Sequence, residues 1–281
     1  MERNVQTFIG CDAGYYEAET VIFGAPFDST TSYRPGARFA CAAIRNESDY
    51  AIETYSPYQD TDLADKKIFD AGDLELPFGN ALRSLEIIET FAKGILEDGK
   101  KLAMIGGEHL VSFGAISAAF ARHPDLKIIH FDAHADLRRD FLGERLSHAS
   151  VLQRAWQLTG DARIFQFGIR SGSREEFEWG KEHIWTEMFT ANRAAEIAAD
   201  LKDSPLYLTL DLDVLDPSEF PGTGTPEAGG LTWKELLQAL LAFKNNNIAA
   251  FDLCELSPHY DHSGVSTALA CKTLREMLLM Y

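Results

Sequence analysis

Short apolar runs alternate with amphipathic segments along the whole of this 281-residue chain. The runs with the length and composition of buried strands are Val21–Phe27, Lys67–Phe69, Leu102–Ile105, Ile128–Phe131, Ile164–Ile169, His183–Trp185, Leu206–Leu210 and Ile248–Leu253. The segments with apolar residues at helical spacing are Ala40–Asn46, Asn80–Leu96, His109–Arg122, His148–Leu158, Ala191–Leu201, Trp233–Phe243 and Val265–Leu279. This alternation predicts right-handed βαβ units, and therefore an α/β fold with a mostly parallel sheet covered by helices on both faces.

The composition is that of an ordinary globular protein, with 46% hydrophobic and 25% charged residues. No internal repeat, low-complexity tract or linker divides the sequence, so we expect residues 1–281 to form a single domain. We expect no membrane partner, because no apolar stretch is long enough to cross a bilayer and the N-terminus lacks a secretory apolar region. The four cysteines are widely spaced and form no Cys-x-x-Cys pair, which fits a reducing cytoplasm best.

The net charge of −17 restricts the classes of partner. Acidic residues outnumber basic ones by 43 to 26, which argues against nucleic acid, because binding phosphates requires clustered Lys and Arg. The same balance is compatible with a cationic substrate or with metal ions, and much of it is also what a solvated surface requires.

Residues that bind metal ions follow several of the expected strands. Asp132, His134 and Asp136 occupy alternate positions after one apolar run, and an extended backbone sends alternate side chains to the same side. The carboxyl ends of parallel strands meet at one edge of a sheet, where ligands bind in such folds. The full set at this edge is His109, Asp132, His134, Asp136, Asp211, Asp213 and Glu255, with His148 nearby.

Two short motifs next to these residues have further implications. The pair Gly106-Gly107 is expected to let the backbone turn tightly and approach a ligand closely. No Gly-x-x-x-x-Gly-Lys follows, so we expect no nucleotide loop. Ser147 is a good N-cap for a helix that would expose His148 at the mouth of the site, where it would act as a proton carrier or be a plain solvated histidine.

Acidic groups gathered at one edge repel each other unless cations neutralise them. Two divalent ions sharing carboxylate bridges would do so. A ligand set rich in oxygen, with two imidazoles and no thiolate, favours Mn²⁺ over structural zinc. Paired metals lower the pKa of a bridging water towards about 7, which indicates hydrolytic chemistry.

The order of these motifs resembles the ureohydrolase family, which includes arginase and agmatinase. The motifs are Gly106-Gly107-Glu108-His109, Asp132-Ala133-His134-Ala135-Asp136, Ser147-His148-Ala149-Ser150 and Asp211-Leu212-Asp213-Val214-Leu215-Asp216-Pro217. The resemblance runs from about Gly24 to the C-terminus. It implies a three-layer α/β/α fold with an eight-stranded, mostly parallel sheet, as in arginases and deacetylases, and a centre of two Mn²⁺ ions per chain.

The resemblance also implies a role for each site residue. It assigns one Mn²⁺ to His109, Asp132, Asp136 and Asp211, and the second to Asp132, His134, Asp211 and Asp213. A hydroxide bridging the two ions would attack the guanidinium carbon of the substrate. Glu255 would bind the guanidinium, Asp136 would orient the hydroxide and pass its proton to the leaving amine, and His148 would relay protons to solvent. The products would be urea and an amine.

Within the family, the sequence is most similar to bacterial agmatinases. Arginases carry an Asn two residues after the Asp-x-His-x-Asp motif, and here that position is Arg138. The segments Arg138–Ser150 and Phe23–Ser48 resemble those of agmatinases, which make putrescine for polyamine biosynthesis. Agmatine is therefore the favoured small cationic guanidino substrate. A guanidinobutyrase is the alternative, because Arg138 is also suited to bind a substrate carboxylate.

Two other readings remain open. A zinc amide deacetylase of the same fold would need only one metal site. A catalytically silent metal-binding regulatory protein would keep the ligands without hydrolysis. Family members are commonly trimers or hexamers, so the resemblance also implies a homo-oligomer.

Overall fold

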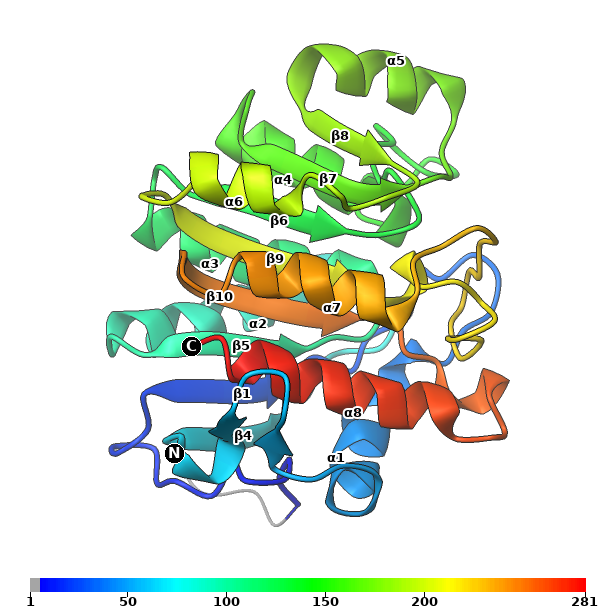
Figure 1. The fold of residues 1–281 in the computed structure, drawn as a ribbon. Helices are drawn as coiled ribbons and strands as arrows, with labels where there is room; N and C mark the ends of the chain where they lie inside the picture. The colour runs from blue at the N-terminus through cyan, green and yellow to red at the C-terminus, as the bar shows by residue number, and fades with distance from the viewer. Residues whose placement is uncertain (1–5) are drawn as a thin grey trace.

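The computed structural model describes residues 6–281, and an eight-stranded sheet runs through it (Figure 1). All neighbouring strands in this sheet are parallel. In spatial order they are β4 (Ile68–Asp73), β1 (Thr20–Gly24), β5 (Lys101–Ile105), β10 (Asn247–Cys254), β9 (Pro205–Asp211), β6 (Lys127–Phe131), β7 (Ile164–Ile169) and β8 (Trp185–Met188). A separate small hairpin consists of β2 (Tyr55–Ser56) and β3 (Thr61–Asp62).

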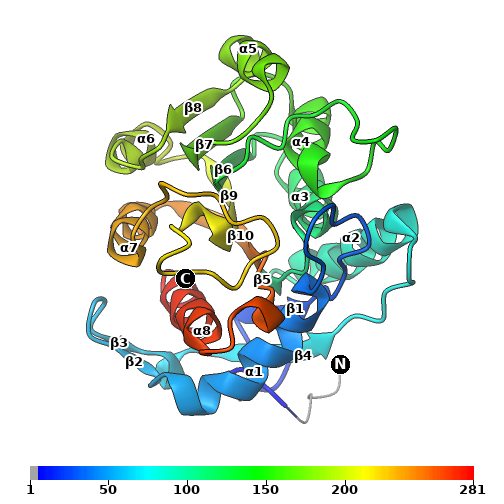
Figure 2. The same ribbon diagram turned by 90° about the vertical axis from the view of Figure 1, so that its right-hand side faces the viewer.

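Helices cover both faces of the sheet, which gives three layers (Figures 1 and 2). One layer consists of α1 (Ala40–Ala51), α6 (Ala194–Asp200), α7 (Trp233–Ala242) and α8 (Val265–Leu278), the other of α2 (Ala81–Glu97), α3 (Ser112–Arg122) and α4 (Val151–Thr159), while α5 (Arg174–His183) packs beside β8. Successive strand side chains point to opposite faces, so Ile22 joins the core under α1 and α8 while Val21 and Phe23 join the core under α2 and α3. None of the helices in residues 6–281 combines the length and the apolar character required to cross a membrane.

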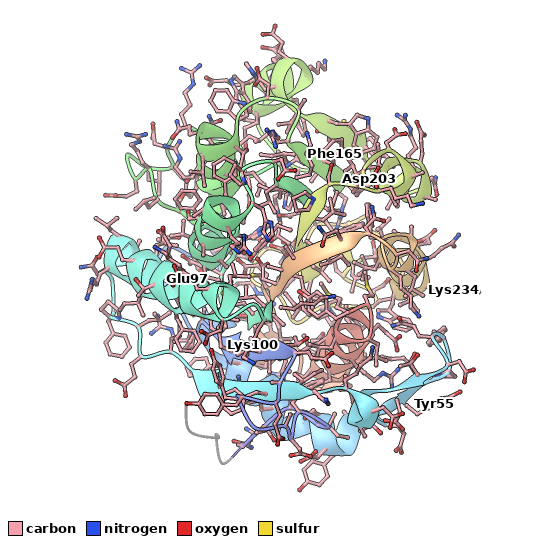
Figure 3. All side chains as sticks on the ribbon, turned by 90° about the vertical axis from the view of Figure 1, so that its left-hand side faces the viewer. Tyr55, Glu97, Lys100, Phe165, Asp203 and Lys234 are labelled. Atoms are coloured by element: carbon pink, nitrogen blue, oxygen red, sulfur yellow. The ribbon has the colours of Figure 1, made fainter. Side chains whose placement is uncertain are left out.

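The connections bring four ligand-bearing strands together. The chain leaves β5 through α3 and enters β6, and β10 and β9 later fill the space between those two strands. The carboxyl ends of all the strands open on the side shown in Figure 2. The amino ends lie on the opposite side (Figure 3), where Glu97 ends α2 and Lys100 directly precedes β5. Ligands in open α/β sheets bind outside the carboxyl ends, so the side in Figure 2 is where the site belongs.

The expected fold class is confirmed, and so are seven of the eight expected strands with small shifts of their ends. The assignment of 183–185 to a strand is wrong in part, because His183 is the last residue of α5 and the strand begins at Trp185. Helix α5 and the hairpin β2–β3 were not expected. The hairpin strands are two residues long, too short for any periodicity to register.

Gly106 and Gly107 pack tightly against the protein itself, and their approach to a ligand stays a prediction. A Cβ on Gly107 would lie 2.0 Å from the carbonyl oxygen of Phe27, and a Cβ on Gly106 would lie 2.3 Å from Sγ of Cys254. The two glycines therefore make room for neighbouring strand ends of the protein itself. The backbone N–H of Glu108 then donates a hydrogen bond to the Phe27 carbonyl at 2.8 Å, which ties the end of β5 to the loop after β1.

Candidate metal centre

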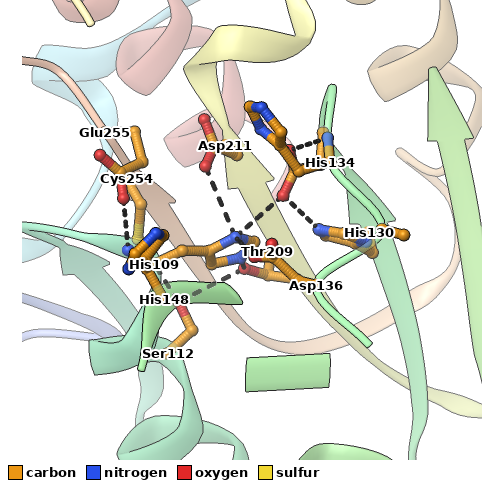
Figure 4. Close-up of polar contacts among 12 residues, drawn as sticks. His109, Ser112, His130, His134, Asp136, His148, Thr209, Asp211, Cys254 and Glu255 are labelled. Atoms are coloured by element: carbon orange, nitrogen blue, oxygen red, sulfur yellow. Dashed lines mark hydrogen bonds and ion pairs between the residues drawn. The ribbon is translucent and has the colours of Figure 1, made fainter. Parts of the chain in front are cut away.

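The sequence-predicted site residues meet above the carboxyl ends of β5, β10, β9 and β6 (Figure 4). All of them except Asp132 and Asp213 line a cavity of about 210 Å³. Ligand pockets for drug-sized molecules span roughly 300–1,000 Å³, so this cavity suits a small substrate. Its lining consists of Ser32, His109, His134, Ala135, Asp136, Arg138, Phe141, His148, Ala149, Ser171, Gly172, Glu176, Asp211, Thr225 and Glu255.

The first group of potential ligands surrounds the His109 side chain. His109 opens the helical segment after β5, and its Nδ1 lies 3.0 Å from Oδ2 of Asp132 and 3.2 Å from Oδ2 of Asp136. Oδ2 of Asp211, the last residue of β9, lies 3.5 Å from the same nitrogen. One imidazole nitrogen and three carboxylate oxygens therefore converge on a single point.

The second group surrounds His134. Its Nδ1 lies 3.4 Å from Oδ1 of Asp132 and 3.0 Å from Oδ2 of Asp213. The two oxygens of Asp132 thus point towards different histidines, which is the arrangement expected of a carboxylate that bridges two ions. Asp213 is fixed in this position because its Oδ1 accepts a hydrogen bond from the Ala133 N–H at 3.1 Å. The two groups together contain the six residues assigned as metal ligands.

The protonation of the His109 ring follows from its neighbours. The Thr209 hydroxyl donates to Oδ1 of Asp252 at 2.8 Å, so its oxygen accepts the hydrogen bond from Nε2 of His109, also at 2.8 Å. Nδ1 is therefore the ring nitrogen that is left to bind a metal. Outer partners of this kind orient histidine ligands in metal sites.

The electrostatics of the site favour bound cations. Burial, followed by the charge of Asp132, raises the pKa of Asp136 to about 7. Burial and the charge of Asp213 raise the pKa of Asp211 well above its usual range. Burial alone would lower the pKa of His109, but the carboxylates of Asp132 and Asp136 raise it well above the ordinary value. Divalent cations would compensate this concentration of buried acids, and the donor set of carboxylate oxygens and imidazole nitrogens fits them.

Two site residues have a left-handed backbone that non-glycine residues rarely adopt. Asp136 has φ 54° and Glu255 has φ 67°. Such conformations cost about 1–3 kcal/mol each and concentrate at functional sites. The Asp136 carbonyl accepts hydrogen bonds from the N–H groups of Leu152 and Gln153 in the first turn of α4, and the Glu255 N–H donates to the Gly107 carbonyl. These bonds hold both residues in a conformation that presents their side chains to the cavity.

Sequence reasoning missed His130, which lies directly beneath the site. Its Nε2 lies 2.8 Å from Oδ2 of Asp132. Gln166 fixes the tautomer, because its amide nitrogen lies 3.0 Å from Nδ1 of His130 while also donating to the Ala135 carbonyl, and its amide oxygen accepts from Thr186. His130 therefore donates from Nε2 and supports Asp132 without taking a ligand position. The sequence spacing could have indicated this contact, because His130 precedes Asp132 by two residues and therefore points to the same side of the strand.

We expect His130→Leu to weaken Mn²⁺ binding by about 10- to 100-fold, the usual cost of losing an outer partner of a ligand. His130→Gln, whose amide reaches a similar position to Nε2, should recover part of this loss. The measurement is calorimetric titration of chelator-treated protein with Mn²⁺. The exposed His262 provides the matched control, His262→Leu. Wild-type affinity in a folded His130→Leu protein would contradict the assignment.

His148 is half-buried, so the prediction that it is exposed is wrong. Its Nε2 lies 3.2 Å from Oγ of Ser32, its backbone N–H donates to Oγ1 of Thr30, and its ring packs edge-on against Phe141. Nδ1 is buried and has no hydrogen-bond partner among the described residues. Burial lowers the pKa of His148 to about 4. The ring is therefore neutral at pH 7, with one nitrogen able to accept a proton and the other able to donate one.

Glu255 lies next to the first ligand group. Its Oε1 accepts a hydrogen bond from the backbone N–H of His109 at 2.8 Å. Burial, followed by the charge of the neighbouring Glu108, raises the pKa of Glu255 well above its usual range. Glu108 itself is buried and accepts hydrogen bonds from the hydroxyls of Thr30 and Thr31. Glu255 is thus a buried acid facing the cavity without an Arg or Lys partner among the ion pairs of the described residues, a suitable receptor for a cationic group.

The chain is similar to known proteins over nearly its whole length. The sequence model of the arginase family matches residues 18–280. The agmatinase of Bacillus subtilis (strain 168) is 48% identical over 279 residues, covering 98% of this chain and 96% of that protein. The guanidinobutyrase of Pseudomonas aeruginosa is 31% identical, covering 92% of this chain and 85% of that protein. The crystal structure of the agmatine ureohydrolase of Thermoplasma volcanium superimposes with a TM-score of 0.91 at 32% identity, covering 99% of this chain and 94% of that chain. The chain belongs to the arginase family.

Proposed function

We propose that this chain hydrolyses agmatine to putrescine and urea with two Mn²⁺ ions bound. The observation that carries the proposal is the convergence of two potential ligand groups on Asp132, beside a cavity lined by His109, His134 and the acid Glu255. The choice of agmatine is supported by the 48% identity with an agmatinase over nearly the whole length of both chains. A small, net acidic cavity suits a substrate with two positive charges.

The residues that would hold the ions are largely those whose donor atoms already converge, while the place of Asp211 at the second ion rests on the family resemblance. One ion would bind His109, Asp132, Asp136 and Asp211, and the other would bind Asp132, His134, Asp211 and Asp213. When bound, two such ions lower the pKa of a shared water enough to make hydroxide available at neutral pH. Carboxylate and imidazole donors without thiolate suit Mn²⁺.

The other residues would position the substrate and move protons. Oε1 of Glu255 accepts from the His109 N–H, which leaves Oε2 to form a charge-assisted hydrogen bond with the substrate guanidinium. Asp136 would receive a proton from the attacking water and deliver it to the leaving amine. His148, with Nε2 next to Ser32 and a buried Nδ1, would exchange protons between the cavity and solvent.

The test is urea release from agmatine, arginine and 4-guanidinobutyrate, each with added Mn²⁺ and with chelator. We expect urea from agmatine with Mn²⁺, little from the other two substrates, and none after chelation. Urea from arginine alone would overturn the choice of substrate. Equal release with and without metal would overturn the metal-dependent mechanism.

A guanidinobutyrase is the second candidate, favoured by the presence of Arg138 in the cavity lining and by the 31% identity with such an enzyme. Preferential urea release from 4-guanidinobutyrate in the same assay would establish it. A zinc deacetylase would bind one ion, and a silent regulatory protein would bind metal without releasing urea from any guanidine.

We also propose that residues 1–281 act as one domain in the cytoplasm, assembled into a homo-oligomer. One continuous sheet through the described chain supports the single domain. All four cysteines are buried free thiols, which suits a reducing compartment. Light scattering coupled to size-exclusion chromatography tests the assembly, with a trimer or hexamer expected and a monomer contradicting it.

A further inference from the structure

We propose that Glu176 determines which substrate tail the cavity accepts, by neutralising Arg138. This inference rests on the proposed function, because it concerns the end of the substrate opposite to the guanidinium. Both residues line the same cavity as the potential metal ligands. Arg138 is the one Arg or Lys among the described residues of that lining, so its charge is the main obstacle to a cationic tail.

The two side chains form an unequal pair. Nε of Arg138 lies 3.5 Å from Oε2 of Glu176. The Arg138 side chain is 41% exposed, whereas the Glu176 side chain is 5% exposed. The guanidinium of Arg138 also lies over the ring of Phe141, with Cζ 4.8 Å from the ring centre. Arg138 is therefore held against the cavity wall at its solvent side by one carboxylate and one aromatic face.

Glu176 is fixed by bonds that do not involve Arg138. Its Oε1 accepts a hydrogen bond from the Leu137 N–H at 3.0 Å, and its Oε2 accepts one from the Ser173 N–H at 2.8 Å. The Ser173 bond belongs to the capping box that begins α5. The negative charge consequently stays at the wall whether or not Arg138 moves. Glu176 therefore places a fixed negative charge at the outer cavity, and the more exposed Arg138 places a positive charge beside it.

This arrangement discriminates between substrate tails. An unpaired Arg138 would repel the ammonium of agmatine and attract the carboxylate of 4-guanidinobutyrate. With Glu176 beside it, the pair has no net charge, so Arg138 neither repels the ammonium nor attracts the carboxylate strongly. The preference for agmatine therefore depends on the pair as a unit, and each member shifts it in a different direction.

The test uses Arg138→Gln, Glu176→Gln and the double variant, each loaded with Mn²⁺. Gln at position 176 keeps a capping-box residue in place. The matched controls are Arg139→Gln and Glu175→Gln, which change exposed neighbours of the same charge. The readout is the ratio of kcat/KM for agmatine to that for 4-guanidinobutyrate. Butylguanidine, whose tail is uncharged, reports any general damage to the site.

We expect Arg138→Gln to raise the ratio about tenfold and Glu176→Gln to lower it about tenfold. The double variant, which again has no net charge at the pair, should return to within about threefold of wild type. Both control variants should keep the ratio within about twofold of the wild-type value, and the butylguanidine turnover of each variant is the reference against which its two kcat/KM values are read. A ratio that is unchanged in both single variants, or that moves in the same direction in both, would overturn the inference.

Failure of this inference is distinguishable from failure of the proposed function. Wild-type protein that releases urea from none of the three guanidines would refute the proposed function. Wild-type protein that is active, with a ratio unmoved by Arg138→Gln, would refute only the role of the pair. Arg138 is half-exposed on a loop, so this variant remains informative even where Glu176→Gln fails to fold.

Discussion

Replacing Asp211 by Asn should reduce urea release from agmatine by about a thousandfold or more. Asp211 ends β9 with Oδ2 3.5 Å from Nδ1 of His109, and it is assigned to both ions. The electrostatic contribution of such ions is worth several kcal/mol, and each 1.36 kcal/mol is a factor of about ten in rate. The bound metal should fall from two ions per chain to one or none, which elemental analysis of the purified variant measures.

The same variant should not lose stability when metal is absent. Burial and the charge of Asp213 raise the pKa of Asp211, so the ionised carboxylate is unfavourable in the metal-free fold. Asn removes that charge with little change in shape, and the melting temperature without metal should equal or exceed that of metal-free wild type. A variant that melts well below wild type without metal, or that keeps two ions and full activity, would contradict the assignment of Asp211.

The second large effect is expected at Glu255. Changing it to Gln should lower kcat/KM for agmatine by about 30- to 5,000-fold, because removing one member of a buried, hydrogen-bonded charge pair costs roughly 2–5 kcal/mol. The number of bound ions should stay at two, since Glu255 is not among the assigned ligands. Steady-state kinetics and metal analysis on the same preparation distinguish a role of Glu255 in substrate binding from a role as a metal ligand.

Glu227→Gln provides a control for Glu255, because Glu227 belongs to the loop after β9 and does not line the cavity. It should leave kcat/KM within about twofold of wild type. Loss of metal in Glu255→Gln would show that this carboxylate is a ligand. An unchanged KM and kcat would show that it does not bind the guanidinium.

Strongly periodic segments made the sheet predictable from sequence. The buried strands have apolar runs long enough to be distinguished from their surroundings, and strand–helix alternation restricts the topology. Helix α5 was not predicted because it is mostly charged and buries little of its surface. Its sequence therefore lacks the apolar periodicity by which a helix is recognised, and its place depends on packing beside β8. Its capping box, Ser173 with Glu176, was the usable signal.

The site was predictable where side chains that can bind metal follow directly after a predicted strand. Asp132, His134 and Asp211 lie at carboxyl strand ends, where ligands bind in open α/β sheets, and the structure brings them together around His109 and Asp132. His130 was not predicted because a histidine inside an apolar run is usually a core residue. Its contact with Asp132 depends on a ring orientation set by Gln166, which is distant in sequence.

The environments of His148 and Arg138 were not predicted because each depends on residues that are distant in the sequence. The burial of His148 depends on Ser32 and Phe141, which pack against it from separate loops. The partner of Arg138 is Glu176, 38 positions further along the chain and on a helix that the periodicity does not reveal. No local pattern contains such contacts.

The central claim is tested most directly by adding Mn²⁺ stepwise to chelator-treated protein while recording both bound metal and urea release from agmatine. Binding should saturate at two ions per chain, and urea release should reach its full rate only as the second ion binds. Saturation at one ion, or full urea release before any metal is added, would contradict that claim.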